Sequence, residues 1–361
     1  MENTNNRLDY IDIAKAVGMF AIIWGHILLH GWSNLFVYSF HIPLFFFLSG
    51  MVFNGAKYDS LWQLVKRRAK TLLLPYLLFS VLTWIIWVGT KIVSHEQVNL
   101  FFPLLETVFA QGSVGYVVHN LPLWFVPCLF VVEIVYYFMN KLPEWLVLIC
   151  CVCCALIGNY MIRGGHLDFF SQLPWSIEGA MNAIFYYALG NILIKHVPHH
   201  KLVDKISSYK VLSIISIIVL TIILLYSSIH NGAISVGSNE LGNNTVLYYI
   251  NALIGITTTL AFCILLSQIR TKTAMGNSVL NYIKWFGRNS FYVMATHFPV
   301  KEAFIRLLGF VLHTNREAVV SNMKYSLIVF ILTLLVDSVV VLVVCKLKEK
   351  DLQRIVKKNN G

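Results

Sequence analysis

The stretch DIAKAVGMFAIIWGHILLH, residues 12–30, includes the ionisable side chains Lys15 and His26, with only apolar or small residues between them. Eleven residues make about three helical turns and roughly 16 Å of rise, so both side chains lie on one stripe of a helix at different depths. Ionisable groups are costly at membrane depth and usually line a pathway or a site there. This stretch therefore predicts a membrane helix that carries function.

The composition of the whole chain also indicates a membrane protein. Of its 361 residues, 57% are hydrophobic and 12% are charged, and the mean hydropathy is +0.69. Stretches near twenty apolar residues predict an all-α integral membrane protein, a bundle of about ten transmembrane helices in one domain over residues 1–361. We expect these spans at 13–30, 35–53, 71–93, 121–139, 145–162, 176–194, 211–229, 246–269, 286–305 and 324–345.

The ninth expected span, 286–305, differs from the others in its charge. It carries Lys301 and Glu302 near its end, and Arg306 follows directly. This leaves open whether part of the segment lies along the interface or turns inward.

The distribution of Lys and Arg predicts the orientation of the helices. With both termini in the cytoplasm, 21 of the 28 basic residues fall in cytoplasmic segments, and the outer loops 94–120 and 230–245 contain none. The positive-inside rule favours this orientation. The basic cytoplasmic tail 346–361 is expected to meet anionic head groups of the lipid bilayer. These segments account for the net charge of +11, so we expect no nucleic-acid partner.

The first of three candidate clusters lies in the opening helix. Asp12 and Lys15 are three residues apart and can pair on one helix face, which would offset the cost of burial. His26 is deeper and has no partner nearby in the sequence, so a neutral imidazole there could take or hand on a proton. The alternative is a structural ion pair and a hydrogen-bonded core histidine.

The second cluster is SFHIPLFFFLSG, residues 39–50. His41 begins a phenylalanine-rich helix, and on the predicted orientation it approaches His26 in the outer half of the membrane. Gly50 permits close helix packing, and Ser49 can hydrogen-bond across helices or to its own backbone. Ser49 should lie nearer the inner face, which argues against a serine nucleophile.

The third cluster is KRRAKTLLLPY, residues 66–76, at the predicted cytoplasmic rim. Arg67, Arg68 and Lys70 could bind a polyphosphate ligand that arrives from the cytosol. The same residues could equally be a topology signal without a ligand.

The cysteines and the loop histidines do not suggest a metal site. Four of the seven cysteines crowd the run CCVCC, residues 150–154, without a flanking His or acidic residue. Zinc would need converging ligands, so we expect buried thiols there. His196, His199 and His200 lie in a Lys-rich loop and are expected to be solvated.

Together the three clusters resemble the membrane-bound acyltransferase 3 family, in particular its branch of small sugar O-acetylases. Lys15 and His26 are similar to the family's basic-residue-x10-His element, with Lys in place of the more frequent Arg. The second cluster, from His41 to Gly50, resembles its HxPLFFxxSG-like helix. Arg67 and Lys70 before LLLPY resemble its RxxR element, with Lys in place of the second Arg. Weaker likenesses are LPLWFVPCLF, residues 121–130, and FGRNSFYVMATH, residues 286–297.

The resemblance implies an O-acyltransferase, and within that class an O-acetyltransferase, that uses cytosolic acetyl-CoA or another acyl-CoA and a carbohydrate acceptor. It implies a multi-pass protein of the bacterial cytoplasmic, or plasma, membrane. The candidate catalytic residues are His26, Lys15, His41 and His297, and no metal is expected. His26 would be a general base or a transient acyl acceptor, and Lys15 would position the donor. The donor's phosphates would meet Arg67, Arg68 and Lys70.

Two other classes of function compete with this reading. A proton-coupled transporter or flippase of a free or lipid-linked sugar would also place Lys, His, Asp and Glu within about ten spans. Transporters often have paired halves with broken helices at matching positions, and residues 1–180 and 181–361 show no such symmetry. The other alternative is an interaction or sensor protein that has lost catalysis.

Overall fold

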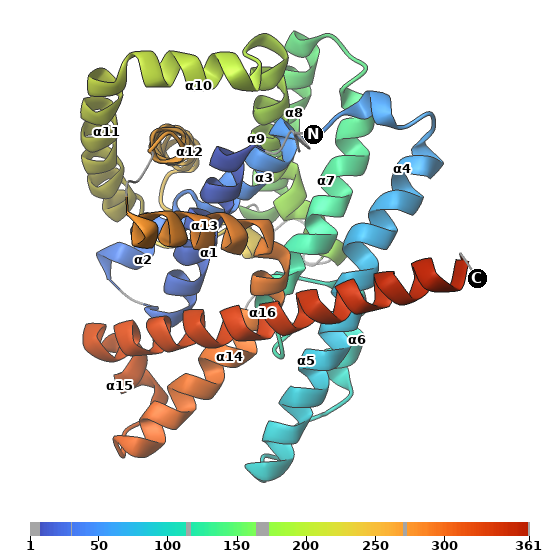
Figure 1. Ribbon diagram of the computed structural model, residues 1–361, viewed down its shortest axis with the longest axis vertical. Coiled ribbons are helices and arrows are strands. Elements are labelled where there is room, and N and C mark those ends of the chain that lie inside the picture. The colour runs from blue at the N-terminus through green and yellow to red at the C-terminus, as the bar shows by residue number, and fades with distance from the viewer. Residues whose placement is uncertain (1–7, 30, 113–116, 164–172, 270–272, 360–361) are drawn as a thin grey trace.

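The computed structural model describes residues 8–29, 31–112, 117–163, 173–269 and 273–359, and these residues are almost entirely helical (Figure 1). The α-helices of the first half are α1 (Asp9–Ile27), α2 (Trp32–Tyr38), α3 (His41–Met51), α4 (Leu61–Arg68), α5 (Leu74–Val93), α6 (Phe102–Phe109), α7 (Phe125–Met139) and α8 (Glu144–Arg163). Those of the second half are α9 (Ile177–His196), α10 (His199–Ser208), α11 (Lys210–Asn231), α12 (Thr245–Ser267), α13 (Ala274–Arg288), α14 (Ser290–Val311), α15 (Arg316–Ser321) and α16 (Met323–Asn359).

Short elements join these helices. Four are 3-10 turns, namely η1 (Gly55–Lys57), η3 (Leu121–Trp124), η4 (Pro174–Ser176) and η5 (Val236–Ser238). The segment η2 (Ala69–Leu73) is π-helical and links α4 to α5. Two strands, β1 (Ile234–Ser235) and β2 (Glu240–Leu241), pair antiparallel with Ile234 opposite Leu241.

Eight stretches of the described chain are long and apolar enough to cross a membrane, which confirms an all-α membrane protein. They are Asp9–Ile27, Trp32–Met51, Leu61–Val93, Leu121–Met139, Pro174–His196, Lys210–Asn231, Thr245–Ser267 and Met323–Glu349. Each overlaps one of the predicted spans. The predicted span 145–162 corresponds to α8. Its apolar stretch Glu144–Asn159 is shorter than these eight and is not one of them. The total of about ten spans and the cytoplasmic position of the termini stay predictions.

Three predicted segments differ in detail from the structure. The segment 286–305 is broken at Asn289, where the backbone leaves the helical region. Residues 286–288 are therefore the end of α13, and residues 290–305 belong to α14. The second span is interrupted between α2 and α3 at Ser39–Phe40. The basic tail is not separate, because α16 continues helically to Asn359. Residue 30 of the first span and residues 360–361 of the tail lie outside the described residues.

Helix α1 is the centre of the bundle. It contacts α2, α3, α12, α13, α14 and α16, and Figure 1 shows it beside α3 and α13 in the middle of the molecule. Its residues are mostly buried, as expected for a helix that is apolar on all sides. The position of α1 therefore fixes the surroundings of Lys15 and His26.

Close packing of α3 against α9 depends on two glycines. A Cβ atom on Gly50 would lie 2.0 Å from the backbone oxygen of Tyr187, and one on Gly190 would lie 2.2 Å from that of Phe47. Asn191 adds hydrogen bonds from Nδ2 to the carbonyl oxygens of Gly50 at 3.1 Å and Phe53 at 2.9 Å. The close approach that the sequence predicted for Gly50 is present.

The first turn of α1 is joined to α13 by ion pairs. Asp9 Oδ2 accepts a hydrogen bond from Lys284 Nζ at 2.5 Å, and Asp12 Oδ2 accepts one from Arg288 Nε at 2.9 Å. Carboxylates also suit the first turn of a helix because they face its positive dipole end. Arg288 was not an expected partner of Asp12, because the two residues are far apart in the sequence.

Candidate active site

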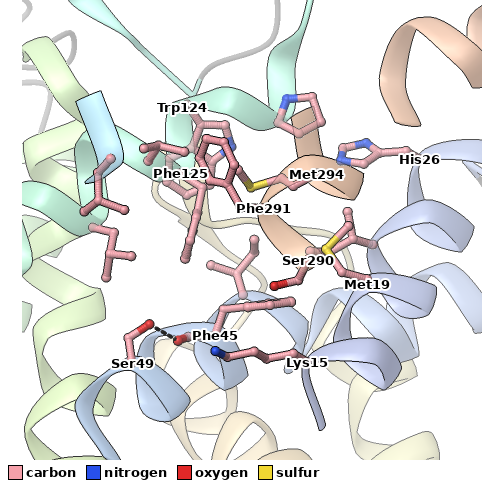
Figure 2. A pocket seen from close by; sticks show the side chains of 16 residues that line it. Lys15, Met19, His26, Phe45, Ser49, Trp124, Phe125, Ser290, Phe291 and Met294 are labelled. Carbon is pink, nitrogen blue, oxygen red and sulfur yellow. Dashed lines mark hydrogen bonds between the residues drawn. The ribbon is translucent and has the colours of Figure 1, made fainter. Parts of the chain in front are cut away.

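One elongated cavity of about 170 Å³ runs beside α1. Figure 2 shows Lys15 and Ser49 at one end and His26 toward the other, with aromatic and methionine side chains between them. The lining is mainly apolar and comes from α1, α3, α7 and α14, together with η2 and η3; its labelled members are Lys15, Met19, His26, Phe45, Ser49, Trp124, Phe125, Ser290, Phe291 and Met294. The cavity is thus a narrow apolar passage with a polar group near each end.

The sequence spacing in α1 explains why Lys15 and His26 share this cavity. Together with Met19 and Ile22 they line it at intervals of four, three and four residues, which is the repeat of one helix face. The stripe predicted from residues 12–30 is therefore the wall of the cavity. Ser49 donates a hydrogen bond to the carbonyl oxygen of Phe45 at 2.8 Å, the backbone bond anticipated for it.

Three histidines gather at the His26 end. The ring of His297 lies 5.6 Å from that of His26, centroid to centroid. Tyr38 lies between His26 and His41, with its ring centroid 6.3 Å from that of His26 and 4.9 Å from that of His41. The structure thus brings together all three histidines named from the sequence. It adds Tyr38, which the sequence analysis missed although it precedes His41 by three residues.

Backbone contacts define the tautomers of two of these histidines. His41 Nδ1 lies 2.6 Å from the carbonyl oxygen of Val37, and His297 Nδ1 lies 3.1 Å from that of Val293. Because a carbonyl oxygen only accepts, Nδ1 carries the proton in each ring and Nε2 keeps its lone pair. Nε2 of His297 is buried and has no hydrogen-bond partner among the described residues. It can therefore accept a proton or a hydrogen bond from a ligand.

A buried cation stands behind the histidines. Lys301 is 2% exposed, donates from Nζ to Glu302 Oε1 at 2.6 Å, and places Nζ 4.3 Å from the ring centroid of Phe298. Glu302 also accepts a hydrogen bond from Arg316 Nη2 at 2.9 Å. Lys301 was not predicted as a site residue, although its spacing of four from His297 puts both on one face of α14.

The basic side chains at the end of α4 and the start of η2 point in different directions. Arg68 Nε lies 2.6 Å from Glu133 Oε2, which is on α7 and almost fully buried. The guanidinium of Arg67 lies over the ring of Tyr58 at 5.8 Å, and Lys70 is exposed. Leu72, in the same π-helical segment, lines the cavity. Arg67 and Lys70 are thus accessible beside the cavity, whereas Arg68 is directed to another helix.

Two histidines of the predicted Lys-rich loop have structural partners outside the cavity. His196 Nε2 lies 2.6 Å from Glu144 Oε2, and His199 Nδ1 lies 2.6 Å from the hydroxyl of Tyr10. Burial lowers the pKa of His199 from its ordinary value. Among the described residues, no group of three or more His, Cys, Asp or Glu side chains is arranged to hold a metal ion.

The structure thus combines a bundle of apolar helices with a mainly apolar cavity that has histidines near one end. The chain belongs to the Acyl_transf_3 family, described as an acyltransferase domain, whose model matches residues 8–344. The protein is therefore a multi-pass membrane acyltransferase, as the resemblance predicted.

One relative adds a partial match. The chain is 37% identical over 93 residues to the nodulation protein NolL of Mesorhizobium japonicum, and the match covers 22% of this chain and 25% of that protein. The chain therefore spans about a quarter of the length of this relative. No solved structure matches the chain.

Proposed function

We propose that this protein is an O-acetyltransferase that moves an acetyl group from cytosolic acetyl-CoA to a hydroxyl of a cell-surface or exported carbohydrate. Its site would be in the bacterial cytoplasmic membrane. The observation that supports this most is the single cavity that has Lys15 at one end and His26 at the other. A narrow apolar passage suits a slender acyl-pantetheine arm better than a sugar ring.

The basic segment fits the nucleotide end of the donor. Arg67 and Lys70 are exposed, lie three residues apart and precede Leu72 of the cavity wall. Guanidinium and ammonium groups bind phosphates strongly because the hydrogen bonds are charge-assisted. Arg68 would act less directly, since its guanidinium is paired with Glu133 and fixes the segment against α7.

The inner end of the cavity suits the arm of the donor. Lys15 is a long cation among apolar side chains, and its ammonium group can donate to the carbonyl oxygens of the pantetheine amides. It is about 16 Å along the helix from His26, which is too far to act at the reacting carbon. We therefore assign Lys15 to positioning the donor.

The histidine end would carry the chemistry. As a general base, His26 takes the proton of the acceptor hydroxyl while the hydroxyl oxygen forms a bond to the thioester carbon. The carbon–sulfur bond then breaks, and the CoA thiolate leaves and receives a proton. In the other route, His26 itself accepts the acetyl group and passes it to the hydroxyl in a second step. His297 and His41 would hold His26 and the acceptor in position in both routes.

The test measures CoA release from acetyl-CoA by purified protein in lipid nanodiscs, with and without a mixture of candidate glycans. Wild type is compared with His26→Ala and with His230→Ala, which alters an exposed histidine of α11 away from the cavity. We expect glycan-stimulated release from wild type and His230→Ala, and none from His26→Ala. Release that does not need His26 would remove the catalytic assignment. Glycan movement across the bilayer without CoA release would instead favour the transporter.

A further inference from the structure

A second cavity of about 360 Å³ lies between α5 and α14. Its polar lining includes Thr83, Lys91, His119, Glu302 and Arg306. None of its lining residues belongs to the first cavity. It is therefore a separate site that the proposed donor path does not use.

A single aromatic ring connects the second cavity to the reaction centre. Phe298 lines the cavity, and its ring is 6.0 Å from that of His26 in an edge-to-face arrangement. His26 itself lines the first cavity. His26 therefore lines the first cavity and lies next to Phe298, which lines the second.

The second cavity has an excess of positive charge. Lys91 pairs with Glu96, and Glu302 is already paired with two cations, Lys301 and Arg316. Arg306 is exposed and makes no hydrogen bond or ion pair within the part of the chain that the structure describes. Its charge acts at longer range on Glu96, which is already paired with Lys91. The lining and its immediate partners thus comprise four cations and two carboxylates. An anionic group beside Arg306 would correct this imbalance.

A buried imidazole offers a second unused polar group. His119 is 2% exposed, its Nε2 lies 3.5 Å from Thr107 Oγ1, and its Nδ1 has no partner among the described residues. The Thr107 hydroxyl donates to the backbone oxygen of Pro103, so it accepts from Nε2 and leaves Nδ1 with a lone pair. Burial lowers the pKa of His119 to about 4, which keeps the ring neutral. Nδ1 can therefore accept a hydrogen bond from a ligand hydroxyl.

Aromatic side chains complete the lining. Trp87 and Phe298 both border the second cavity. The faces of such rings pack against the apolar faces of sugar rings, while the hydroxyl groups of the sugar reach polar neighbours. Cations, an unpaired imidazole and two aromatic side chains together fit a charged saccharide better than an acyl chain.

We infer that the second cavity binds the acceptor and that this acceptor is an anionic glycan whose carboxylate or phosphate pairs with Arg306. This rests on the proposed acyltransferase reaction, in which the acceptor hydroxyl must reach His26. Rotation of the Phe298 ring would bring the hydroxyl and His26 together. Lys91, on α5, supplies a second cation to the lining of the cavity.

The test measures binding, so that it does not depend on catalysis. His26→Ala protein in nanodiscs of neutral lipid is titrated with oligogalacturonate and with hyaluronan oligosaccharide, each also as its fully methyl-esterified form, which keeps the sugar and removes the charge. We expect at least one anionic glycan to bind, with its methyl ester weaker by about ten-fold or more. Equal binding of the charged and esterified forms, or binding of neither, would overturn the inference.

Two variants then test whether the charged glycan binds in the second cavity. Arg306→Gln in the same background should weaken binding of the charged glycan about ten-fold. Lys324→Gln, which alters an exposed cation of α16 outside the cavity, should not change it. Equal affinities of the two variants would exclude Arg306 as the anion partner. If Arg306→Gln instead reduces retention of phosphatidylglycerol and leaves glycan binding unchanged, the cavity is a lipid site.

The two proposals fail in different ways. If CoA release is absent or does not depend on His26, the proposed acyltransferase reaction is wrong, whatever the glycan affinities are. If the charged and esterified glycans bind equally while CoA release still requires His26, only the proposed acceptor site is wrong.

Discussion

Arg68 Nε lies 2.6 Å from Glu133 Oε2, and this ion pair joins the end of α4 to the buried face of α7. Glu133 is 2% exposed, whereas the side chain of Arg68 keeps 25% of its surface exposed. The pair thus removes one of the three basic side chains of residues 67–70 from the set that faces the solvent. It also gives a structural role to an acidic residue within a predicted span.

Glu133→Gln should therefore destabilise the fold rather than alter the chemistry. The substitution leaves the Arg68 cation without its carboxylate, and breaking a buried pair costs about 3–5 kcal/mol, with the lower end expected because Arg68 is partly exposed. Thermal unfolding in detergent micelles measures the effect. The double variant Glu133→Gln/Arg68→Gln should recover part of the loss, and no recovery would argue against a direct pair.

Gly50→Ala should lower the unfolding temperature because its Cβ would overlap the backbone oxygen of Tyr187. Overpacking costs about 1–3 kcal/mol, and backbone atoms relax less than side chains. Gly89→Ala is the matched control, since a Cβ there meets nothing within 4 Å. Equal unfolding temperatures for the two variants would show that α3 and α9 can separate without cost.

Arg67→Ala should weaken acetyl-CoA binding without lowering the unfolding temperature. Its guanidinium is exposed and lies over the ring of Tyr58. Loss of one charge-assisted hydrogen bond costs about 1.5–3 kcal/mol, which corresponds to roughly ten-fold or more in affinity. Lys205→Ala, at an exposed cation of α10, serves as the control. An unchanged dissociation constant for acetyl-CoA in Arg67→Ala would separate this residue from the donor.

His119 should make the fold sensitive to acid. Burial lowers its pKa from 6.5 to about 4, so between these values the unfolded chain binds a proton that the folded protein does not. Stability then falls as the pH drops below about 6.5 and stops falling near pH 4. At pH 5 the loss is about 2 kcal/mol. His119→Gln should show a smaller fall in unfolding temperature from pH 7.5 to pH 5, and equal slopes would contradict a buried neutral imidazole.

The helix α1, which lines the first cavity, could be predicted from the sequence because its signal is local. Lys15 and His26 stand in an apolar run, and helical periodicity alone places them on one stripe. The predicted convergence of His41 and His26 also follows from depth, since consecutive spans reverse direction and bring their adjacent ends to the same side of the membrane.

Other features depend on contacts between distant parts of the chain. The direction of Arg68 was not predictable, because Glu133 lies on a different helix and three neighbouring cations look alike in the sequence. The break at Asn289 was also missed, since the residues on both sides of it are suited to a helix. Lys301 was recognised as a charge near the end of a predicted span, but only the packing of α14 shows that it is buried behind His297.

The ring of Phe298 has a consequence for the membrane itself. If the two cavities hold donor and acceptor as proposed, CoA stays on one side and the glycan on the other, and only a two-carbon group has to pass between them. The Phe298 ring, which lies beside His26, would interrupt a column of water between the two cavities. The enzyme could then deliver acyl groups outward while the bilayer remains electrically tight.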